Sequence, residues 1–238
     1  MLPTVVLVHG AFADSAGWDA VIDPLRGAGH PVIAAANPLR GLAADAQSVS
    51  DLVRSIEGPV VIVAHSYGGA VMSNVDPDCG EIVGLVYVNA FAPDAGESCF
   101  ALAGKFPGSM LGETTLRPVP RSDGTTDLYI VADRFGELFC ADVPAPQAAR
   151  LGVTQRPATQ EALVEPSGAR PLWKQVPSGF VIGTADRIIP PVLQHYMADR
   201  AGAHHMLEIP GASHGAVLSQ PRAIAEFILQ TMRVPAAA

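Results

Sequence analysis

A near-continuous apolar run, Val60–His65, limits most strongly what this chain can fold into. A short run of mainly β-branched residues is typical of a strand whose two faces are both covered, as in a parallel sheet packed between helices. Further runs of this character are Thr4–His9, Val32–Ala36 and Ile82–Asn89. The chain is therefore expected to be built around a buried parallel sheet.

Segments with helical periodicity separate these strands. In Leu42–Ile56 the apolar residues recur at alternating steps of four and three, which places them along one stripe of an amphipathic helix. Later in the chain the expected elements are strand Phe180–Gly183, helix Val192–Arg200, strand His205–Ile209 and helix Arg222–Met232. Strands that alternate with helices predict an α/β fold with about six mainly parallel strands and helices on both faces.

The stretch from residue 91 to residue 170 interrupts this alternation. It is rich in Pro and Gly, has no segment that resembles a buried strand, and carries the aromatic residues Phe100, Phe106, Tyr129, Phe135 and Phe139. Long surface loops are the alternative interpretation, but so many aromatic side chains would be poorly placed in solvent. We predict a cap, residues 91–170, inserted after the fourth strand of a core formed by residues 1–90 and 171–238.

Charge and hydropathy exclude several classes of protein. The 238 residues include 15 basic and 23 acidic ones, a net charge of −8, and no Lys or Arg cluster that would favour a nucleic acid or an anionic membrane. No apolar run approaches the roughly 18 to 20 residues of a membrane span. Met1–Thr4 lacks the basic region of a signal peptide. A cytoplasmic protein, monomeric or homodimeric, is expected.

The sequence disfavours both a metal site and a disulfide framework. Cys79, Cys99 and Cys140 are odd in number and widely spaced, which favours buried thiols over a disulfide framework or a zinc site. His195 and Asp199 have the spacing of helical metal ligands, but no third candidate ligand lies nearby in the sequence, so an exposed helix face is preferred. Neither a metal nor an organic cofactor is expected.

Ser66 follows the buried strand directly, in Ala64-His-Ser66-Tyr67-Gly68. Because a helix must begin near Tyr67, the chain reverses within a few residues, and Ser66 is expected at the apex of a tight, strained turn with its Oγ above the sheet. Ala64 and Gly68 are small, as such a turn requires. The N–H of Tyr67, at the helix N-terminus, would face the oxygen of a bound carbonyl group. An ordinary strand-to-helix turn is the alternative if the motif stands alone.

A base for Ser66 is sought at the carboxyl ends of later strands, where ligand chemistry concentrates in parallel sheets. His214 lies in a loop just after the strand His205–Ile209, whereas His195 lies in the middle of a helix, and His204 and His205 open a strand. His214 is therefore the predicted base, and a solvent-exposed loop histidine is the alternative interpretation.

The acid is sought by the same reasoning. Asp186 follows the strand Phe180–Gly183, so it emerges at the same sheet edge and could accept a hydrogen bond from His214 Nδ1. Taken alone, this residue would be interpreted as a turn or helix-capping aspartate. Asp94, beyond the strand Ile82–Asn89, is the second candidate for the acid.

These motifs resemble the active-site motifs of the α/β-hydrolase superfamily. The segment around Ser66 is similar to its nucleophile elbow, Gly-x-Ser-x-Gly, with Ala64 in place of the first glycine. The order Ser66, Asp186, His214 is the superfamily's order of nucleophile, acid and base. His9-Gly10 resembles its oxyanion loop, which implies that the N–H of Ala11 is a second oxyanion donor, facing that of Tyr67.

A narrower resemblance spans nearly the whole chain. Val8–Trp18 resembles the opening of plant methylesterases, hydroxynitrile lyases and bacterial pyrethroid-hydrolase-like esterases, and Leu138–Asp142, Gln155–Pro157 and Asp186–Pro190 are similar to other segments of that group. The lyases typically carry a threonine after the first-strand histidine and a lysine after the catalytic histidine, and that lysine stabilises departing cyanide. Gly10 and Gly215 occupy those positions here and supply neither a hydroxyl group nor a charge. The resemblance therefore implies an esterase.

The combined prediction is a serine hydrolase that cleaves a small, hydrophobic carboxylic ester or lactone through an acyl-enzyme. The catalytic triad would be Ser66, Asp186 and His214. The aromatic residues expected to line an apolar substrate pocket are Phe12, Phe91, Tyr129 and Phe139. A carbon–carbon hydrolase or a cofactor-free perhydrolase would use the same triad, and a non-catalytic small-ligand-binding protein is the alternative of a different class.

Overall fold

The computed structural model describes residues 1–232, so residues 233–238 of the predicted core lie outside the described residues. A parallel sheet has the spatial strand order β2-β1-β3-β4-β8-β9. Its strands are β1 (Thr4–Val8), β2 (Val32–Ala35), β3 (Pro59–Ser66), β4 (Glu81–Ala90), β8 (Ser178–Gly183) and β9 (His205–Ile209). The predicted fold, a parallel sheet with an insertion after its fourth strand, is confirmed.

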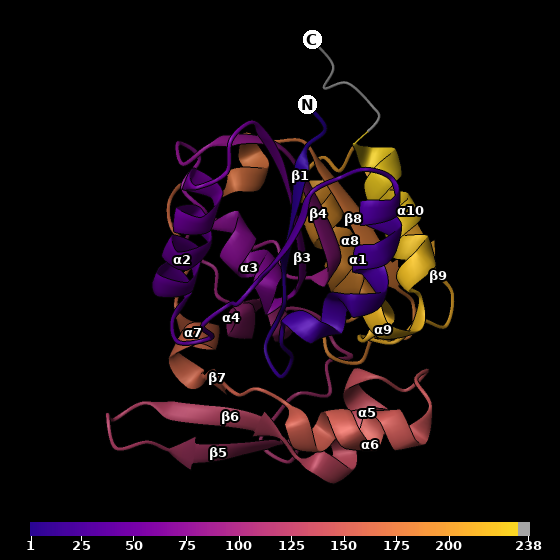
Figure 1. Cartoon of the computed structure of the whole chain (residues 1–238). Helices are drawn as coiled ribbons and strands as arrows, with labels where there is room; N and C mark the ends of the chain where they lie inside the picture. The colour runs from indigo at the N-terminus through magenta and orange to yellow at the C-terminus, as the bar shows by residue number, and fades with distance from the viewer. Residues whose placement is uncertain (233–238) are drawn as a thin grey trace.

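Helices cover both faces of this sheet (Figure 1). One face carries α2 (Leu42–Arg54), α3 (Tyr67–Ser73) and α8 (Pro191–Arg200), and the other carries α1 (Asp19–Gly27) and α10 (Pro221–Thr231). Successive side chains of β3 alternate between the two cores: Ile62 packs on the α2 side and Val61 and Val63 on the α1 side. Because both faces of β3 are covered, its sequence is apolar without alternation.

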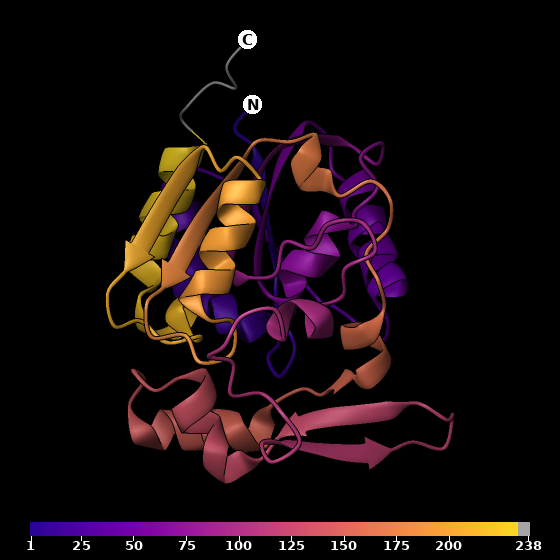
Figure 2. The same ribbon diagram turned by 180° about the vertical axis from the view of Figure 1, so that it is seen from behind.

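Between β4 and β8 the chain forms a separate layer that lies across the carboxyl ends of the core strands (Figures 1 and 2). Its helices are α5 (Ala132–Phe139) and α6 (Ala145–Thr154), and its antiparallel sheet consists of β5 (Leu116–Pro120), β6 (Thr126–Ile130) and β7 (Ala158–Thr159). Two further short helices of the same segment, α4 (Cys99–Ala103) and α7 (Gln160–Val164), lie against the core.

The expectation that residues 91–170 contain no buried strand is wrong for β6. Asp127, Leu128 and Ile130 of this strand are buried. The strand escapes notice in the sequence because a carboxylate occupies one of its buried positions, which breaks the apolar run that marks the core strands. Burial of Asp127 depends on two arginines, of which Arg40 is distant in the chain.

Contacts with Arg40 join the outer layer to the core. Arg40, in the loop after β2, places Nη1 2.7 Å from Asp127 Oδ1, and Arg121 Nη1 lies 3.0 Å from Asp127 Oδ2. Thr159 of β7 also donates its hydroxyl to the carbonyl oxygen of Arg40, at 3.0 Å. A buried carboxylate is stable only when its oxygens are paired, so these contacts fix β6 relative to the sheet.

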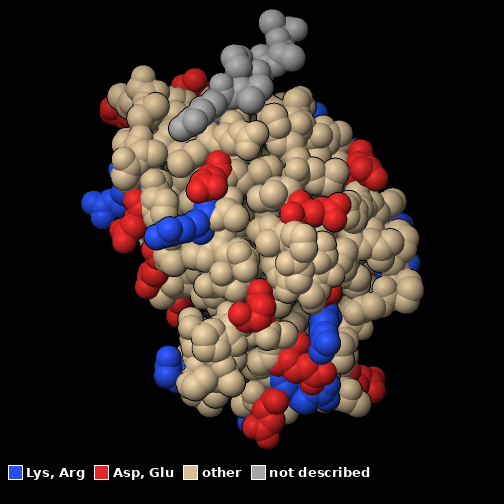
Figure 3. Space-filling model, turned by 90° about the vertical axis from the view of Figure 1, so that its right-hand side faces the viewer, with Lys and Arg blue, Asp and Glu red and all other residues tan. Residues whose placement is uncertain are grey.

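The structure was searched for the two features whose absence the sequence predicts, a membrane-spanning helix and a basic surface patch. Within residues 1–232 no helix combines the length and the apolar character that crossing a bilayer requires. On the face shown in Figure 3, acidic and basic side chains are interspersed among uncharged ones. This face therefore offers no extended basic patch for a polyanion.

Candidate active site

Ser66 ends β3 and directly precedes α3. Its backbone has φ +55° and ψ −127°, a combination that is unfavourable for a residue with a Cβ atom. The two following glycines permit this turn: a Cβ on Gly68 would lie 2.6 Å from the carbonyl oxygen of Val8, and one on Gly69 would lie 2.3 Å from that of Phe91. The small residue that the turn requires at position 68 is thus explained by its contact with β1.

The structure brings Ser66, His214 and Asp186 together at the carboxyl edge of the sheet. His214 Nε2 lies 2.9 Å from Ser66 Oγ, and His214 Nδ1 lies 2.8 Å from Asp186 Oδ2. All three residues are buried. When the proton of the neutral imidazole is on Nδ1, Nε2 can accept the hydrogen bond of the serine hydroxyl. This is the arrangement of a nucleophile, a base and an orienting carboxylate.

The carboxylate of Asp186 is held by further donors. Its Oδ1 accepts hydrogen bonds from the backbone amides of Ile188 and Ile189, at 2.8 and 2.9 Å. Its Oδ2 accepts one from Gln194 Nε2, at 3.0 Å, in addition to that from His214. Gln194, from α8, was not anticipated from the sequence. The feature that could have indicated its role is a glutamine among the buried residues of a helix.

Two core side chains form hydrogen bonds with the backbone of the loop that carries His214. His65 Nε2 lies 2.9 Å from the carbonyl oxygen of His214 and donates to it. Asn89 Nδ2 donates to the carbonyl oxygens of Ser213 and His214, at 2.8 and 3.1 Å, while its Oδ1 accepts from the amide of Gly183, at 2.7 Å. Asn89 thus links β4, β8 and the loop, a role that sequence reasoning missed although an asparagine near the end of an apolar strand is unusual.

The outer layer holds the same loop from the opposite side. The carbonyl oxygen of Phe139, the last residue of α5, accepts from the amide of Gly215 at 2.5 Å. The carboxylate of Asp142 accepts from the hydroxyl groups of Ser213 and Ser219, the latter at 2.6 Å, and from the amide of Ser213 at 3.2 Å. His214 is therefore positioned jointly by the core and by residues 139–142.

We expect Asp142→Ala to lower kcat about ten- to a hundredfold and to leave KM within about twofold, because a small displacement of the base slows proton transfer more than it weakens substrate binding. Steady-state hydrolysis of an activated ester measures both constants. Asp133→Ala, which removes an exposed carboxylate of α5, is the matched control and should leave kcat unchanged. Equal kcat values for the two variants would contradict a positioning role for Asp142.

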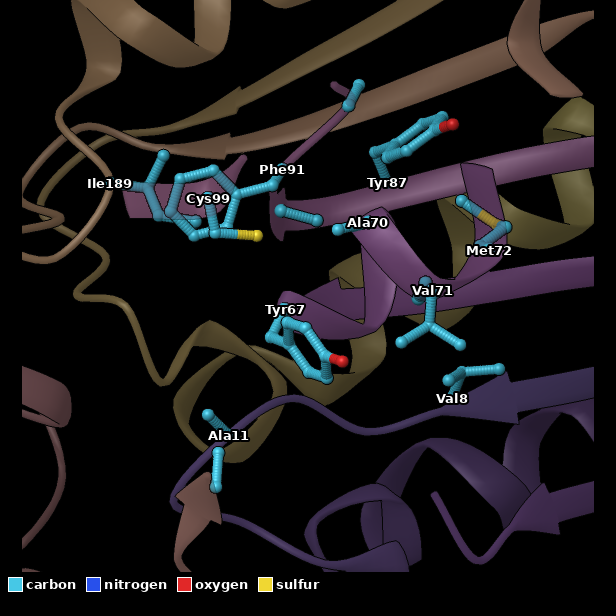
Figure 4. Close-up of a cluster of buried hydrophobic side chains, with 14 of the residues drawn as sticks. Val8, Ala11, Tyr67, Ala70, Val71, Met72, Tyr87, Phe91, Cys99 and Ile189 are labelled. Carbon is cyan, nitrogen blue, oxygen red and sulfur yellow. The ribbon is translucent and has the colours of Figure 1, made fainter. Parts of the chain in front are cut away.

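Ala11 and Tyr67, the predicted oxyanion donors, line one cavity with Ser66. The amide of Tyr67 is the first of α3, so no carbonyl group of its own helix accepts from it. The amide of Ala11 forms no hydrogen bond with the described residues. The loop that carries Ala11 lies close to the nucleophile, since a Cβ on Gly10 would be 2.5 Å from Ser66 Cβ. In Figure 4, Tyr67 lies between Ala11 on one side and Phe91 and Cys99 on the other.

The phenol group of Tyr67 takes no part in this arrangement. Its hydroxyl donates to Asp45 Oδ2 at 2.8 Å, deep in the core beneath α2. Burial raises the pKa of Tyr67 far above its usual value, and burial also raises the pKa of Asp45. The phenol therefore stays protonated and serves as a structural donor.

The cavity beside Ser66 has a volume of about 390 Å³. Phe12 and Phe91 line it, as the sequence predicts, together with residues of α4 and the following loop such as Phe106. Tyr129 and Phe139 are not among the described residues that line it, so the structure does not bring these two to the cavity. Tyr129 alternates along β6 with buried neighbours and lies against Arg117 of β5 instead, with the guanidinium carbon 5.3 Å from the ring centroid.

Phe139 lies beside the base. Its ring meets that of His214 edge-on, with the ring centroids 4.9 Å apart, and it also packs against His65. The sequence analysis predicted that this residue lines the substrate pocket, whereas the structure places it against the histidine rings. The reason is that the C-terminal end of α5 is fixed by its contacts with Ser213 and Gly215.

The other candidates have ordinary structural surroundings. Asp94, the second candidate for the acid, pairs with Lys174 at 2.5 Å. His195 Nε2 lies 3.4 Å from Glu208, and residues 1–232 contain no group of three side chains arranged to hold a metal. The three cysteines are buried thiols. No observation in the described part of the chain indicates a bound cofactor.

Two buried histidines make the stability of the fold depend on pH. Burial lowers the pKa of His9 and lowers that of His65 to well below its usual value. His9 is fixed as a neutral ring, because its Nε2 accepts from the amide of Asn37 at 3.2 Å and its Nδ1 lies 3.0 Å from the carbonyl oxygen of Gly10.

We expect the free energy of unfolding to fall as the pH drops below about 6.5, where the unfolded chain protonates these histidines and the folded protein does not. Each histidine should contribute up to about 1.4 kcal/mol per pH unit. Urea denaturation at pH 7.5, 6.5 and 5.5 measures the slope. His9→Gln should reduce it, and His204→Gln, at an exposed position, should not. An unfolding free energy that stays constant over this range would refute the expectation.

Residues 5–227 match a family model described as the alpha/beta hydrolase family. The chain belongs to the alpha/beta hydrolase family. It is 27% identical to a pyrethroid hydrolase of Sphingobium wenxiniae, over 98% of this chain and 88% of that protein. It is 24% identical to putative methylesterase 19 of Arabidopsis thaliana, over 94% of this chain and 95% of that protein. The predicted resemblance to this group of hydrolases is confirmed.

The fold comparison agrees. A crystal structure of a pyrethroid hydrolase superimposes with a TM-score of 0.81 and 23% sequence identity, over the whole of both chains. Identity at this level shows that the two alpha/beta hydrolases share a fold, and it leaves the substrate open.

Proposed function

We propose that this alpha/beta hydrolase is a serine esterase, which cleaves a small, hydrophobic carboxylic ester or lactone. The observation that carries the proposal is the hydrogen-bonded series Ser66, His214 and Asp186, with separations of 2.9 and 2.8 Å, beside an apolar cavity. The predicted class, carboxylic ester hydrolase, is also the class that the names of the pyrethroid hydrolase and the methylesterase share.

In this proposal Ser66 Oγ attacks the carbonyl carbon of the ester while His214 Nε2 takes the hydroxyl proton. The amides of Ala11 and Tyr67 donate hydrogen bonds to the oxyanion, where each is worth about 3 kcal/mol in the transition state. The intermediate collapses as His214 passes its proton to the leaving alcohol. Water then attacks the acyl-enzyme, with His214 again as the base, and the carboxylic acid leaves.

The lining of the cavity supports an uncharged, hydrophobic acyl group. Phe12, Phe91 and Phe106 form much of its wall, and none of the described residues that line it is charged. A charged substrate group would lose its hydration there without gaining a partner. We propose that residues 91–170 act as the cap that shields this cavity from water. The cytoplasmic location and the monomeric or homodimeric state remain predictions from the sequence.

The two glycines that separate this chain from the lyases support esterase chemistry. A Cβ on Gly10 would lie 2.5 Å from Ser66 Cβ, and one on Gly215 would lie 3.0 Å from the carbonyl oxygen of Phe139. A threonine at position 10 would collide with Ser66, and a lysine at position 215 would make a tight contact with the end of α5. Gly215 also supplies no charge that could stabilise a departing cyanide.

A substrate screen tests this proposal. Purified wild-type protein and Ser66→Ala are assayed with aryl, methyl, lactone and pyrethroid-type esters, and product acid is measured by mass spectrometry. We expect hydrolysis of at least one hydrophobic ester class by the wild type only. Turnover of carbon–carbon substrates or perhydrolysis without ester cleavage would favour those rival reactions, and binding without any turnover would favour the non-catalytic alternative.

A further inference from the structure

A second cavity shares Phe12 with the cavity beside Ser66. Its volume is about 350 Å³, within the range of small-molecule sites. Among the described residues, Phe12 lines both cavities, whereas Ser66 and His214 are absent from the lining of the second one. No step of the proposed mechanism takes place in this second cavity, so we considered which ligand its lining residues would bind.

Aromatic rings form much of the wall of this second cavity. Trp18, from the short helix η1 (Ser15–Trp18), contributes from the core. Phe135 and Phe139 contribute from α5, where their rings stack with centroids 4.8 Å apart. The cavity thus lies between the core and the outer layer, and its wall suits a flat aromatic group.

His65 gives this cavity a hydrogen-bond acceptor. The residue is 2% exposed and lines the cavity. Because its Nε2–H donates to the carbonyl oxygen of His214, the Nδ1 of the neutral ring carries a lone pair, and Nδ1 forms no hydrogen bond with any described residue. This lone pair can accept a hydrogen bond from the hydroxyl group of a ligand in the cavity.

The charges around the cavity select against anions. Its charged lining residues are Asp14 and Asp19, and no described Lys or Arg lines it. A carboxylate ligand would be repelled by these aspartates and would offer His65 no proton. The expected ligand is therefore not an anion, carries an aromatic ring and donates a hydrogen bond.

We propose that this second cavity binds a phenol or an aryl alcohol. The ligand hydroxyl donates to His65 Nδ1, and the ring packs among Trp18 and Phe139. Binding does not depend on catalysis. The functional consequence rests on the proposed esterase activity: such alcohols are the leaving groups of aryl and arylmethyl esters, and one bound here would act on the base through the bond from His65 to His214. Inhibition by phenol is therefore expected to be non-competitive with ester.

Phenol binding, measured by isothermal titration calorimetry, tests the site with a matched pair of variants. Leu151→Trp fills the second cavity and Leu111→Trp fills the cavity beside Ser66, since each leucine lines only one of them. We expect Leu151→Trp to weaken phenol binding at least tenfold and Leu111→Trp to change it less than twofold. Toluene, which lacks the hydroxyl, and benzoate, which is an anion, should each bind the wild type at least tenfold more weakly than phenol.

Imidazole ¹⁵N spectra supply a second readout, because the signal of an unprotonated nitrogen moves upfield when it accepts a hydrogen bond. The Nδ1 signal of His65 should move on addition of phenol to the wild type. An unmoved signal, equal binding of toluene and phenol, or phenol binding that survives Leu151→Trp would overturn the proposal. Phenol binding in a protein without esterase activity would instead refute the proposed function and leave this site intact.

Discussion

Ser66→Ala is expected to lower kcat for an activated ester such as p-nitrophenyl butyrate about 10⁵-fold, with little change in thermal stability. Ser66 Oγ is the hydroxyl that lies 2.9 Å from His214 Nε2, and its loss removes the atom that forms the acyl-enzyme. His214→Ala should cost a similar factor. The double variant should be no slower than either single variant, because the two residues act as one unit.

Release of p-nitrophenol measures these losses. Ser48→Ala, at an exposed position of α2, is the matched control and should retain wild-type kcat. A Ser66→Ala variant that keeps more than a tenth of the wild-type activity would show that another group is the nucleophile.

Asp186→Asn should lower kcat about 10⁴-fold while the protein stays folded, the loss typical of removing this carboxylate from a Ser-His-Asp triad. The amide group can donate to His214 Nδ1, which favours the tautomer with its proton on Nε2. That tautomer cannot accept the proton of Ser66. The amides of Ile188 and Ile189 can still bond the remaining carbonyl oxygen, so the loop should keep its conformation.

The matched control for this variant is Asp94→Asn, which alters the other acid that the sequence leaves open. Asp94 bonds Lys174 and the amide of Ala95, and its side chain is 30% exposed. We expect kcat within about twofold of the wild type. A larger loss in Asp94→Asn than in Asp186→Asn would reverse the assignment of the acid.

The core and the chemistry at its edge could be predicted because they depend on local patterns. A strand covered on both faces must be apolar throughout, so β3 is visible in the sequence without alignment to any other protein. The carboxyl ends of parallel strands share one edge, which places the residues after β3, β8 and β9 near one another. Ser66 ends β3, and Asp186 and His214 lie in the loops that follow β8 and β9.

The surroundings of these residues could not be predicted, because they depend on contacts between distant segments. Asn89 binds the backbone of the loop that carries His214, and Gln194 binds the carboxylate of Asp186; the sequence does not reveal the positions of these loop atoms. The direction of Tyr129 depends on its pairing with Arg117 in the β5–β6 register, and one residue of slip would turn it to the other face. Pocket residues in the inserted segment are therefore the least predictable part of the site.

Covalent labelling of the wild-type protein with a fluorophosphonate, followed by peptide mass spectrometry, tests the central claim most directly. The claim is that Ser66 is a nucleophile activated by His214. The expected result is a single adduct on Ser66, absent from Ser66→Ala and formed far more slowly in His214→Ala. Folded wild-type protein that forms no adduct, or forms one on a residue other than Ser66, would contradict it.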